Sequence, residues 1–164
     1  MRHKSVTVQV PAKVNLQLSV GPKESDGYHQ VVTVFQAISL FDNVKVSEGD
    51  QFSVSVSGGY TNGVPIDQSN LVYKAIELMA EKFDTGKNLD IAIEKSIPVA
   101  GGMAGGSADA AAVLVGIDQL YRLGLSKDEL GEIARKLGSD VPFMLHGGTA
   151  VGRRSEEHTS ELQS

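Results

Sequence analysis

The chain has 164 residues, a length that suits one domain or one and a fraction. Apolar residues make up 41% and charged residues 21%, which excludes wholesale disorder. The formal charge of −5 argues against a nucleic-acid or anionic-membrane partner, and the absence of cysteine excludes disulfides, thiolate zinc sites and cysteine nucleophiles.

The first third of the chain has the pattern of β-strands. Residues 6–10 alternate apolar and polar side chains, Pro11 interrupts the pattern, and residues 14–20 resume it. Gly and Pro punctuate residues 21–27, which predicts a loop. Further strands are predicted from runs rich in β-branched residues at 31–40, 44–46 and 52–56.

A helix is predicted next. Ser69 or Asn70 can cap its start, and Gly86 is predicted to end it. Its apolar face repeats at helical spacing through Val72, Ile76, Met79 and Phe83. Alternating apolar residues then predict a strand over residues 89–93.

Three helices and the start of a strand complete the pattern. The Ala-rich residues 107–123 predict a buried helix that ends at Gly124. Residues 126–137 begin with a capping-box pattern, and residues 139–142 can start another short helix before a strand at 149–151. This order predicts an α+β fold, with helices on one face of a mostly antiparallel sheet.

A glycine-rich segment, residues 98–107, lies between the strand at 89–93 and the Ala-rich helix. A helix N-terminus offers unpaired N–H groups and partial positive charge, and glycines let the backbone approach a phosphate closely. The segment lacks the Lys of a Walker A loop and contains no G-x-G-x-x-G. The residues alone leave open a phosphate cradle or a structural turn that Ser107 caps.

Three further groups of polar residues each have two interpretations. Lys13 and Asn15 share one face of a strand, which is either solvated or part of a site. Tyr28 and His29 follow a turn, and either lie on the surface or stack on and hydrogen-bond a base. Asp140 either caps a helix or orients an attacking hydroxyl or accepts its proton.

The last eleven residues, 154–164, differ from the rest of the chain. They have no apolar periodicity and almost nothing to bury. Their sequence, RSEEHTSELQS, is also the in-frame translation of a common sequencing-library adapter. We interpret them as adapter-derived, with a solvated tail as the alternative, and predict a domain over residues 1–153.

Four motifs resemble, in this order, those of the GHMP kinases, a superfamily of ATP-dependent small-molecule kinases. They are PAKVNL at residues 11–16, DGYH at 26–29, IPVAGGMAGGSADA at 97–110 and LGSDVPF at 137–143. The first and third leave mevalonate, homoserine and related kinases open, whereas DGYH and GSDVPF narrow the resemblance to the kinase of the non-mevalonate isoprenoid pathway. The implied fold is the superfamily's N-terminal domain, which is ribosomal protein S5 domain 2-like, without the C-terminal domain.

The resemblance implies transfer of the γ-phosphoryl group of ATP to the 2-hydroxyl of 4-CDP-2-C-methyl-D-erythritol, with Mg²⁺ as a cofactor. Asp140 would orient or deprotonate the hydroxyl, and Lys13 would stabilise the developing charge. His29 would read the cytosine edge, with Tyr28 and Asn15 nearby. The implied ATP-binding residues are Pro98, Gly101, Gly102, Met103, Ala104, Gly105, Gly106 and Ser107, with Asn70 and Lys95 at the adenine end and Ser107 as a candidate Mg²⁺ ligand.

We expect this activity of the parent protein and not of this fragment, because the C-terminal domain would supply part of the active-site wall. Another GHMP small-molecule kinase and a non-catalytic nucleotide-binding fragment are the alternatives. No apolar stretch of signal length follows the basic residues 1–4, and the pathway then implies the bacterial cytoplasm.

Overall fold

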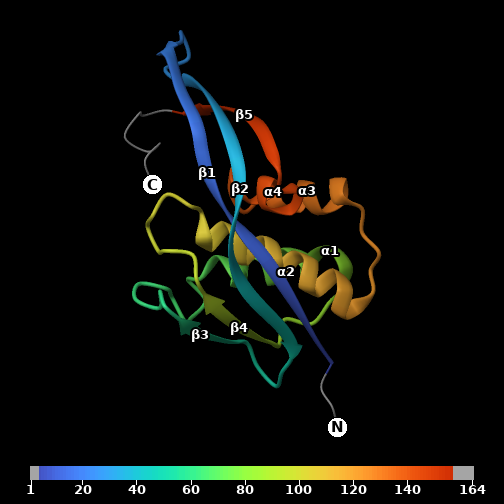
Figure 1. The fold of residues 1–164 in the computed structure, drawn as a ribbon. Coiled ribbons are helices and arrows are strands. Elements are labelled where there is room, and N and C mark those ends of the chain that lie inside the picture. The colour runs from blue at the N-terminus through green and yellow to red at the C-terminus, as the bar shows by residue number, and fades with distance from the viewer. Residues whose placement is uncertain (1–3, 157–164) are drawn as a thin grey trace.

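The computed structural model describes the backbone of residues 4–156 and the side chains of residues 4–153. Strands and helices follow in the α+β order that the pattern predicts (Figure 1). They are β1 (Ser5–Lys23), β2 (His29–Glu48), β3 (Ser53–Gly58), α1 (Leu71–Phe83), β4 (Leu89–Lys95), α2 (Gly105–Tyr121), α3 (Lys127–Arg135), α4 (Val141–His146) and β5 (Thr149–Glu156).

The described strands form one sheet in the order β1-β2-β4-β3, and β5 also pairs with β2. Every pairing is antiparallel except β3 with β4, which confirms the mostly antiparallel sheet. The long strand β2 is central, because its first half pairs with β5 and its second half with β4. The β1–β2 hairpin extends beyond the helices in Figure 1.

The predicted interruption at Pro11 is present, whereas two predicted strands were wrong in extent. The pairing of β1 with β2 shifts register between Pro11 and Lys13 and then continues. Such an irregularity accommodates a residue that has no N–H to donate. The predicted strands at 31–40 and 44–46 are one strand, β2, because β1 pairs along nearly its whole length.

Helix α1 begins where the pattern predicts and ends earlier. Asn70 is its N-cap, and its Oδ1 accepts a hydrogen bond of 3.1 Å from the backbone N–H of Val72. The helix ends at Phe83, because Asp84 adopts the left-handed conformation with φ 54°, and not at Gly86.

Helix α2 begins and ends two residues before its predicted bounds. It starts at Gly105, so Ser107 lies inside the first turn and is not its cap. The N-cap is Ala104, which has φ 55° and makes no side-chain capping bond. Arg122, with φ 54°, ends the helix before Gly124.

The last two helices confirm their start signals. The capping box of Ser126 and Glu129 is present at the start of α3, which ends at Arg135 and not at the predicted residue 137. Asp140 occupies the N-cap position of α4 but makes no capping hydrogen bond. Its carboxylate therefore does not cap the N-terminus of α4.

The core lies between the sheet and α2, which contacts β1 and β2 on one side and α1 on the other. Small residues let α2 approach the sheet closely, and a Cβ at Gly116 would lie only 2.6 Å from a methyl group of Val46. None of the described helices is long and apolar enough to cross a membrane.

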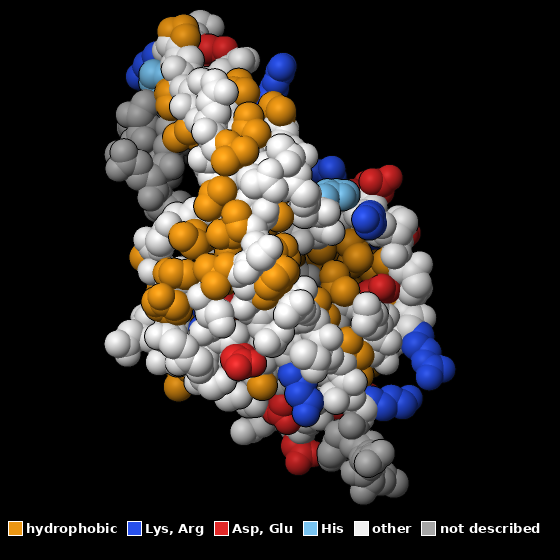
Figure 2. Space-filling model, viewed as in Figure 1, with side chains coloured by type: hydrophobic (Ala, Val, Ile, Leu, Met, Phe, Trp, Pro, Cys, Tyr) orange, Lys and Arg blue, Asp and Glu red, His pale blue; other side chains and the backbone are white. Residues whose placement is uncertain are grey.

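Hydrophobic side chains also gather on the surface of the β1–β2 hairpin (Figure 2). Leu16, Leu18 and Val20 of β1 are exposed there, as is Val151 of β5. Strand β5 continues to Glu156, so the first residues of segment 154–164 pair with β2, and residues 157–164 lie outside the described residues.

Candidate functional site

A pocket of about 400 Å³ lies against the glycine-rich segment between β4 and α2. The predicted ATP-binding residues on its wall are Asn70, Lys95, Pro98, Gly101, Gly102, Ala104, Gly105, Gly106 and Ser107, and Asp140 lies there too. Met103 is not on the wall, and its carbonyl oxygen instead accepts a 3.3 Å hydrogen bond from the N–H of Lys13. The structure thus brings most of the predicted residues together.

The backbone of this segment has the geometry of an anion site. Ala100, Gly102 and Ala104 have φ of 58°, 69° and 55°, whereas the residues between them do not have positive φ. Such alternation turns successive N–H groups toward one side and forms a concavity that binds anions. Left-handed alanines are strained, and strain of this kind concentrates at functional sites. The N-terminus of α2, which no described side chain caps, closes the same concavity.

Lys13 and Asp140 come from distant parts of the chain and meet beside the pocket, whose wall includes Asp140 but not Lys13. The Lys13 ammonium lies 3.9 Å from Oδ2 of Asp140, and their side chains are 8% and 20% exposed. Lys13 is therefore buried and does not lie on a solvated face. The Asp140 carboxylate is next to a cation and lines the pocket, a position that suits contact with a bound substrate.

A chain of hydrogen bonds orients Lys13. Its ammonium donates to Oδ1 of Asn15 at 2.5 Å, and Nδ2 of Asn15 donates to Thr33 at 2.9 Å. Thr33 in turn donates to the carbonyl oxygen of Gln17 at 2.9 Å. The Lys13 ammonium also lies 5.4 Å from the centre of the Phe35 ring. This confirms that Lys13 and Asn15 share a strand face.

Tyr28 and His29 lie at the β1–β2 hairpin and not on the wall of the pocket. Tyr28 is 40% exposed. Nδ1 of His29 lies 2.9 Å from the carbonyl oxygen of Gly21. A carbonyl can only accept, so Nδ1 carries the proton and Nε2 of the neutral ring is an acceptor.

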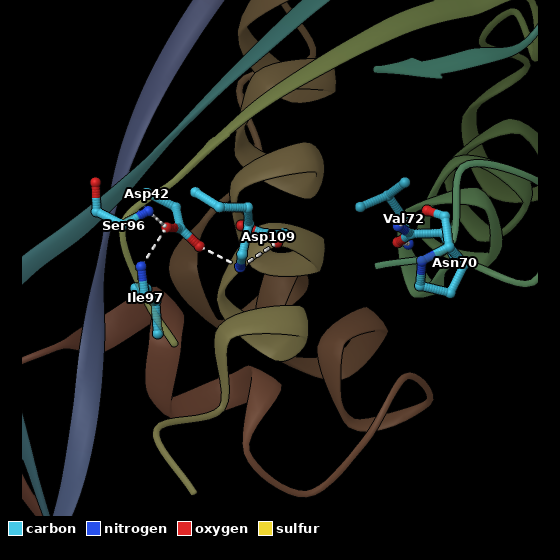
Figure 3. A network of polar contacts seen from close by, with 8 residues as sticks. Asp42, Asn70, Val72, Ser96, Ile97 and Asp109 are labelled. Atoms are coloured by element: carbon cyan, nitrogen blue, oxygen red, sulfur yellow. Dashed lines mark hydrogen bonds and ion pairs between the residues drawn. The ribbon is translucent and has the colours of Figure 1, made fainter. Parts of the chain in front are cut away.

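The pattern analysis did not single out two buried carboxylates, Asp42 and Asp109. Both accept from the ammonium of Lys95, and the Asp109 contact is 2.9 Å. All three residues are at most 2% exposed. Figure 3 shows Asp42 and Asp109 pointing toward each other, with Ser96 and Ile97 beside Asp42. We call these three charged residues the Lys95 cluster.

Asp109 is the unusual member of the Lys95 cluster. Its Oδ1 is buried and has no hydrogen-bond partner among residues 4–153. Burial raises the pKa of the Asp109 carboxyl to about 7, against the opposing effect of the Lys95 ammonium. A sequence signal existed: an Asp within an Ala-rich buried helix needs a buried partner, and alternation along β4 places Lys95 on the buried face.

Asn70 lines the pocket, but its side chain serves the local fold. Besides capping α1, it donates to the carbonyl oxygen of Pro65 at 2.7 Å. Among the described residues, no three Asp, Glu, His or Cys side chains gather as a metal site. Ser107 and Asp140 nevertheless lie on the pocket wall and carry side-chain oxygen atoms, the ligand type that Mg²⁺ prefers.

Comparison with known proteins agrees with this geometry. Residues 70–148 match the family model described as the GHMP kinases N terminal domain. The chain is 56% identical over 149 residues to the 4-diphosphocytidyl-2-C-methyl-D-erythritol kinase of Rhodococcus jostii (strain RHA1), covering 91% of this chain and 48% of that protein. It is 56% identical over 159 residues to the protein of the same name from Mycobacterium leprae (strain TN), covering 96% and 49%.

Solved structures show the same relationship. A crystal structure of 4-(cytidine 5'-diphospho)-2C-methyl-D-erythritol kinase superposes with a TM-score of 0.71 at 38% identity, over 91% of this chain and 52% of that one. Homoserine kinase from Cytophaga hutchinsonii has a TM-score of 0.65 at 19% identity, over 93% and 51%, and shares the fold. The chain spans about half the length of the curated relatives that it matches.

Proposed function

The chain carries the N-terminal domain of a GHMP kinase, and from this premise we propose that the full-length protein phosphorylates the 2-hydroxyl of 4-CDP-2-C-methyl-D-erythritol with ATP, in the bacterial cytoplasm. The observation that carries the proposal is the Lys13–Asp140 pair on the edge of the glycine-lined pocket. The relatives that match over nearly the whole chain bear the name of this kinase.

In this proposal the glycine-rich segment holds the phosphates of ATP. Its alternating backbone and the uncapped start of α2 offer N–H groups to the β- and γ-phosphates. Asn70 and Lys95 lie on the same wall and mark the adenine end. Mg²⁺, when bound, would neutralise phosphate charge, and Ser107 is the candidate protein ligand.

The chemistry requires positioning and one proton acceptor. Asp140 accepts the proton of the 2-hydroxyl while the hydroxyl oxygen attacks the γ-phosphorus of ATP. The bond between that phosphorus and the oxygen that bridges it to ADP breaks, and ADP leaves. Lys13 stabilises the negative charge that develops on the attacking oxygen and the transferred group. Asn15 and Thr33 keep the ammonium aimed at Asp140.

The β1–β2 hairpin would bind the cytidine part of the substrate. Tyr28 presents an exposed ring that can stack on a base. His29 has its Nδ1 proton held by Gly21, which leaves Nε2 to accept a hydrogen bond from the amino group of cytosine.

A substrate panel tests the proposal. We expect the full-length protein to transfer phosphate from ATP to 4-CDP-2-C-methyl-D-erythritol and not to homoserine or mevalonate. His29→Ala should raise the KM for the cytidylyl substrate about tenfold, as loss of one hydrogen bond to a base predicts. His146→Ala, which changes an exposed histidine outside the pocket, is the matched control. Preference for homoserine or mevalonate would instead favour another GHMP kinase.

The second candidate is a nucleotide-binding fragment without catalysis, which the half-length match favours for this 164-residue chain. Asp140→Asn distinguishes the two, because it should abolish turnover by a kinase and leave ATP binding by a non-catalytic fragment unchanged.

We also propose that residues 154–164 derive from a sequencing adapter. Resequencing codons 148–164 without library adapters tests this, and the same codons in the source DNA would contradict it.

A further inference from the structure

The entrance of the glycine-rich segment is tied to β2 through one carboxylate. Asp42 accepts the N–H groups of Ser96 and Ile97 on Oδ1, at 2.7 and 2.9 Å. Its Oδ2 accepts from the ammonium of Lys95, the last residue of β4. The first residues after β4 therefore have fixed positions relative to β2.

The exit of the segment is tied to the same ammonium. Asp109, in the second turn of α2, accepts from Lys95 at 2.9 Å. The ammonium also lies directly against the first residue of α2, because a Cβ added at Gly105 would be 2.9 Å from Nζ of Lys95. One buried cation, the Lys95 ammonium, thus joins β4, β2 and α2 where the segment begins and ends, between the labelled Asp42 and Asp109 of Figure 3.

We propose that Asp42 and Asp109 are positioning residues of the phosphate-binding segment, which they shape by holding Lys95 between its two ends. The inference rests on the proposed function only for the identity of the bound anion, which would be the phosphates of ATP. The contacts of Lys95 with Asp42 and Asp109 do not depend on that function. A buried ion cluster adds little stability over apolar residues, because desolvation offsets its attraction. Its directional bonds can instead maintain the strained backbone of Ala100 and Ala104, which needs support from its surroundings.

Two substitutions on the same helix separate positioning from stability. Asp109→Ala removes the tie to Lys95 and suits an Ala-rich helix. Asp118→Ala is its control, because Asp118 accepts the N–H of Leu125 at 2.9 Å at the opposite end of α2. The readouts on the 164-residue chain are amide exchange without ligand, followed by NMR, and the Kd for ATP.

The informative amides are those bonded at the two ends of the segment. They belong to Ser96, Ile97 and Ala108, which donates to the carbonyl oxygen of Ala104 at 2.9 Å. We expect Asp109→Ala to accelerate their exchange and to weaken ATP binding, each about tenfold, which equals about 1.4 kcal/mol. Asp118→Ala should accelerate exchange at Leu125 and leave the ends of the segment and the ATP Kd unchanged.

The outcomes distinguish this inference from the proposed function. Faster exchange at the segment ends in Asp109→Ala, with no ATP binding even by the wild-type chain, would support positioning and contradict nucleotide binding. Wild-type exchange there, or an equal effect of Asp118→Ala, would overturn the positioning role. If Asp109→Ala does not fold, Asp109→Asn keeps the shape and one acceptor. Asp109→Asn is then expected to accelerate exchange less than Asp109→Ala would. Exchange at the wild-type rate in Asp109→Asn would overturn the inference.

Discussion

Gly105→Ala is the most specific test of how closely Lys95 supports the glycine-rich segment. The new Cβ would lie 2.9 Å from the Lys95 ammonium and 3.2 Å from a methyl group of Ile97. Both distances are shorter than the roughly 3.5–4.0 Å of favourable packing. A lysine end group usually moves away easily, but this one is held by Asp42 and Asp109, and Ile97 is fully buried.

The magnitude follows from two opposing effects. Overpacking of a buried site costs about 1–3 kcal/mol, and replacing a helical glycine by alanine returns about 0.5–1 kcal/mol. We therefore expect Gly105→Ala to lower the free energy of unfolding by about 1 kcal/mol. Gly106→Ala is the matched control, because its Cβ would meet no atom within 4 Å, and it should gain up to about 1 kcal/mol.

Urea unfolding of both variants, followed by circular dichroism, measures the difference. We expect Gly105→Ala to be less stable than Gly106→Ala by about 2 kcal/mol, which is roughly 4–8 °C in Tm for a domain of this size. Equal stability, or a more stable Gly105→Ala, would refute the argument that the Lys95 cluster occupies a rigid position beneath α2.

Three further predictions concern capping, proton binding and charge. Ser126→Ala removes the capping box of α3 and should lower the free energy of unfolding by about 1 kcal/mol in urea titrations, whereas no change would show that the cap is dispensable. The pKa of Asp109 is about 7 in the folded protein against an ordinary 3.8, so the folded state holds an extra proton between these values. Stability should therefore fall as pH rises from 4 to 8, relative to Asp109→Asn at each pH, and parallel pH profiles would contradict this. Lys13→Met in the full-length protein should lower kcat about 10²–10³-fold and leave ATP affinity unchanged, and a wild-type kcat would remove Lys13 from the chemistry.

Local patterns predicted the parts of the fold that local forces decide. The alternation along β4, the Asn70 cap and the capping box of α3 are all present, because each depends on residues close in sequence. The ends of α2 were predicted two residues too late, because left-handed Ala104 and Arg122 bound the helix in place of Ser107 and Gly124. Intrinsic helix propensities of single residues do not include tertiary packing, which can override them at a helix end.

The continuity of β2 was missed for a related reason. Asp42 interrupts an apolar run and suggests a break, but its carboxylate is turned inward to Lys95 and to two backbone N–H groups. The strand therefore continues through a charged residue. Only the tertiary arrangement, which brings β4 beside β2, supplies the partner that makes this burial possible.

The candidate site shows the same division. The shared strand face of Lys13 and Asn15 follows from their spacing and is confirmed. The approach of Asp140 to Lys13 does not follow from any local pattern, because β1 and the start of α4 are distant in sequence. The family resemblance supplied that pairing, whereas it gave no role to Asp42 and Asp109.

The most direct test of the central claim is the position of the transferred phosphate. The full-length protein is incubated with ATP and 4-CDP-2-C-methyl-D-erythritol, and the product is analysed by phosphorus NMR. We predict a new phosphomonoester on the 2-hydroxyl with the wild-type protein, and none with Asp140→Asn, although that variant still binds ATP. Wild-type rates from Asp140→Asn, or no transfer by a wild-type protein that binds ATP, would contradict the account.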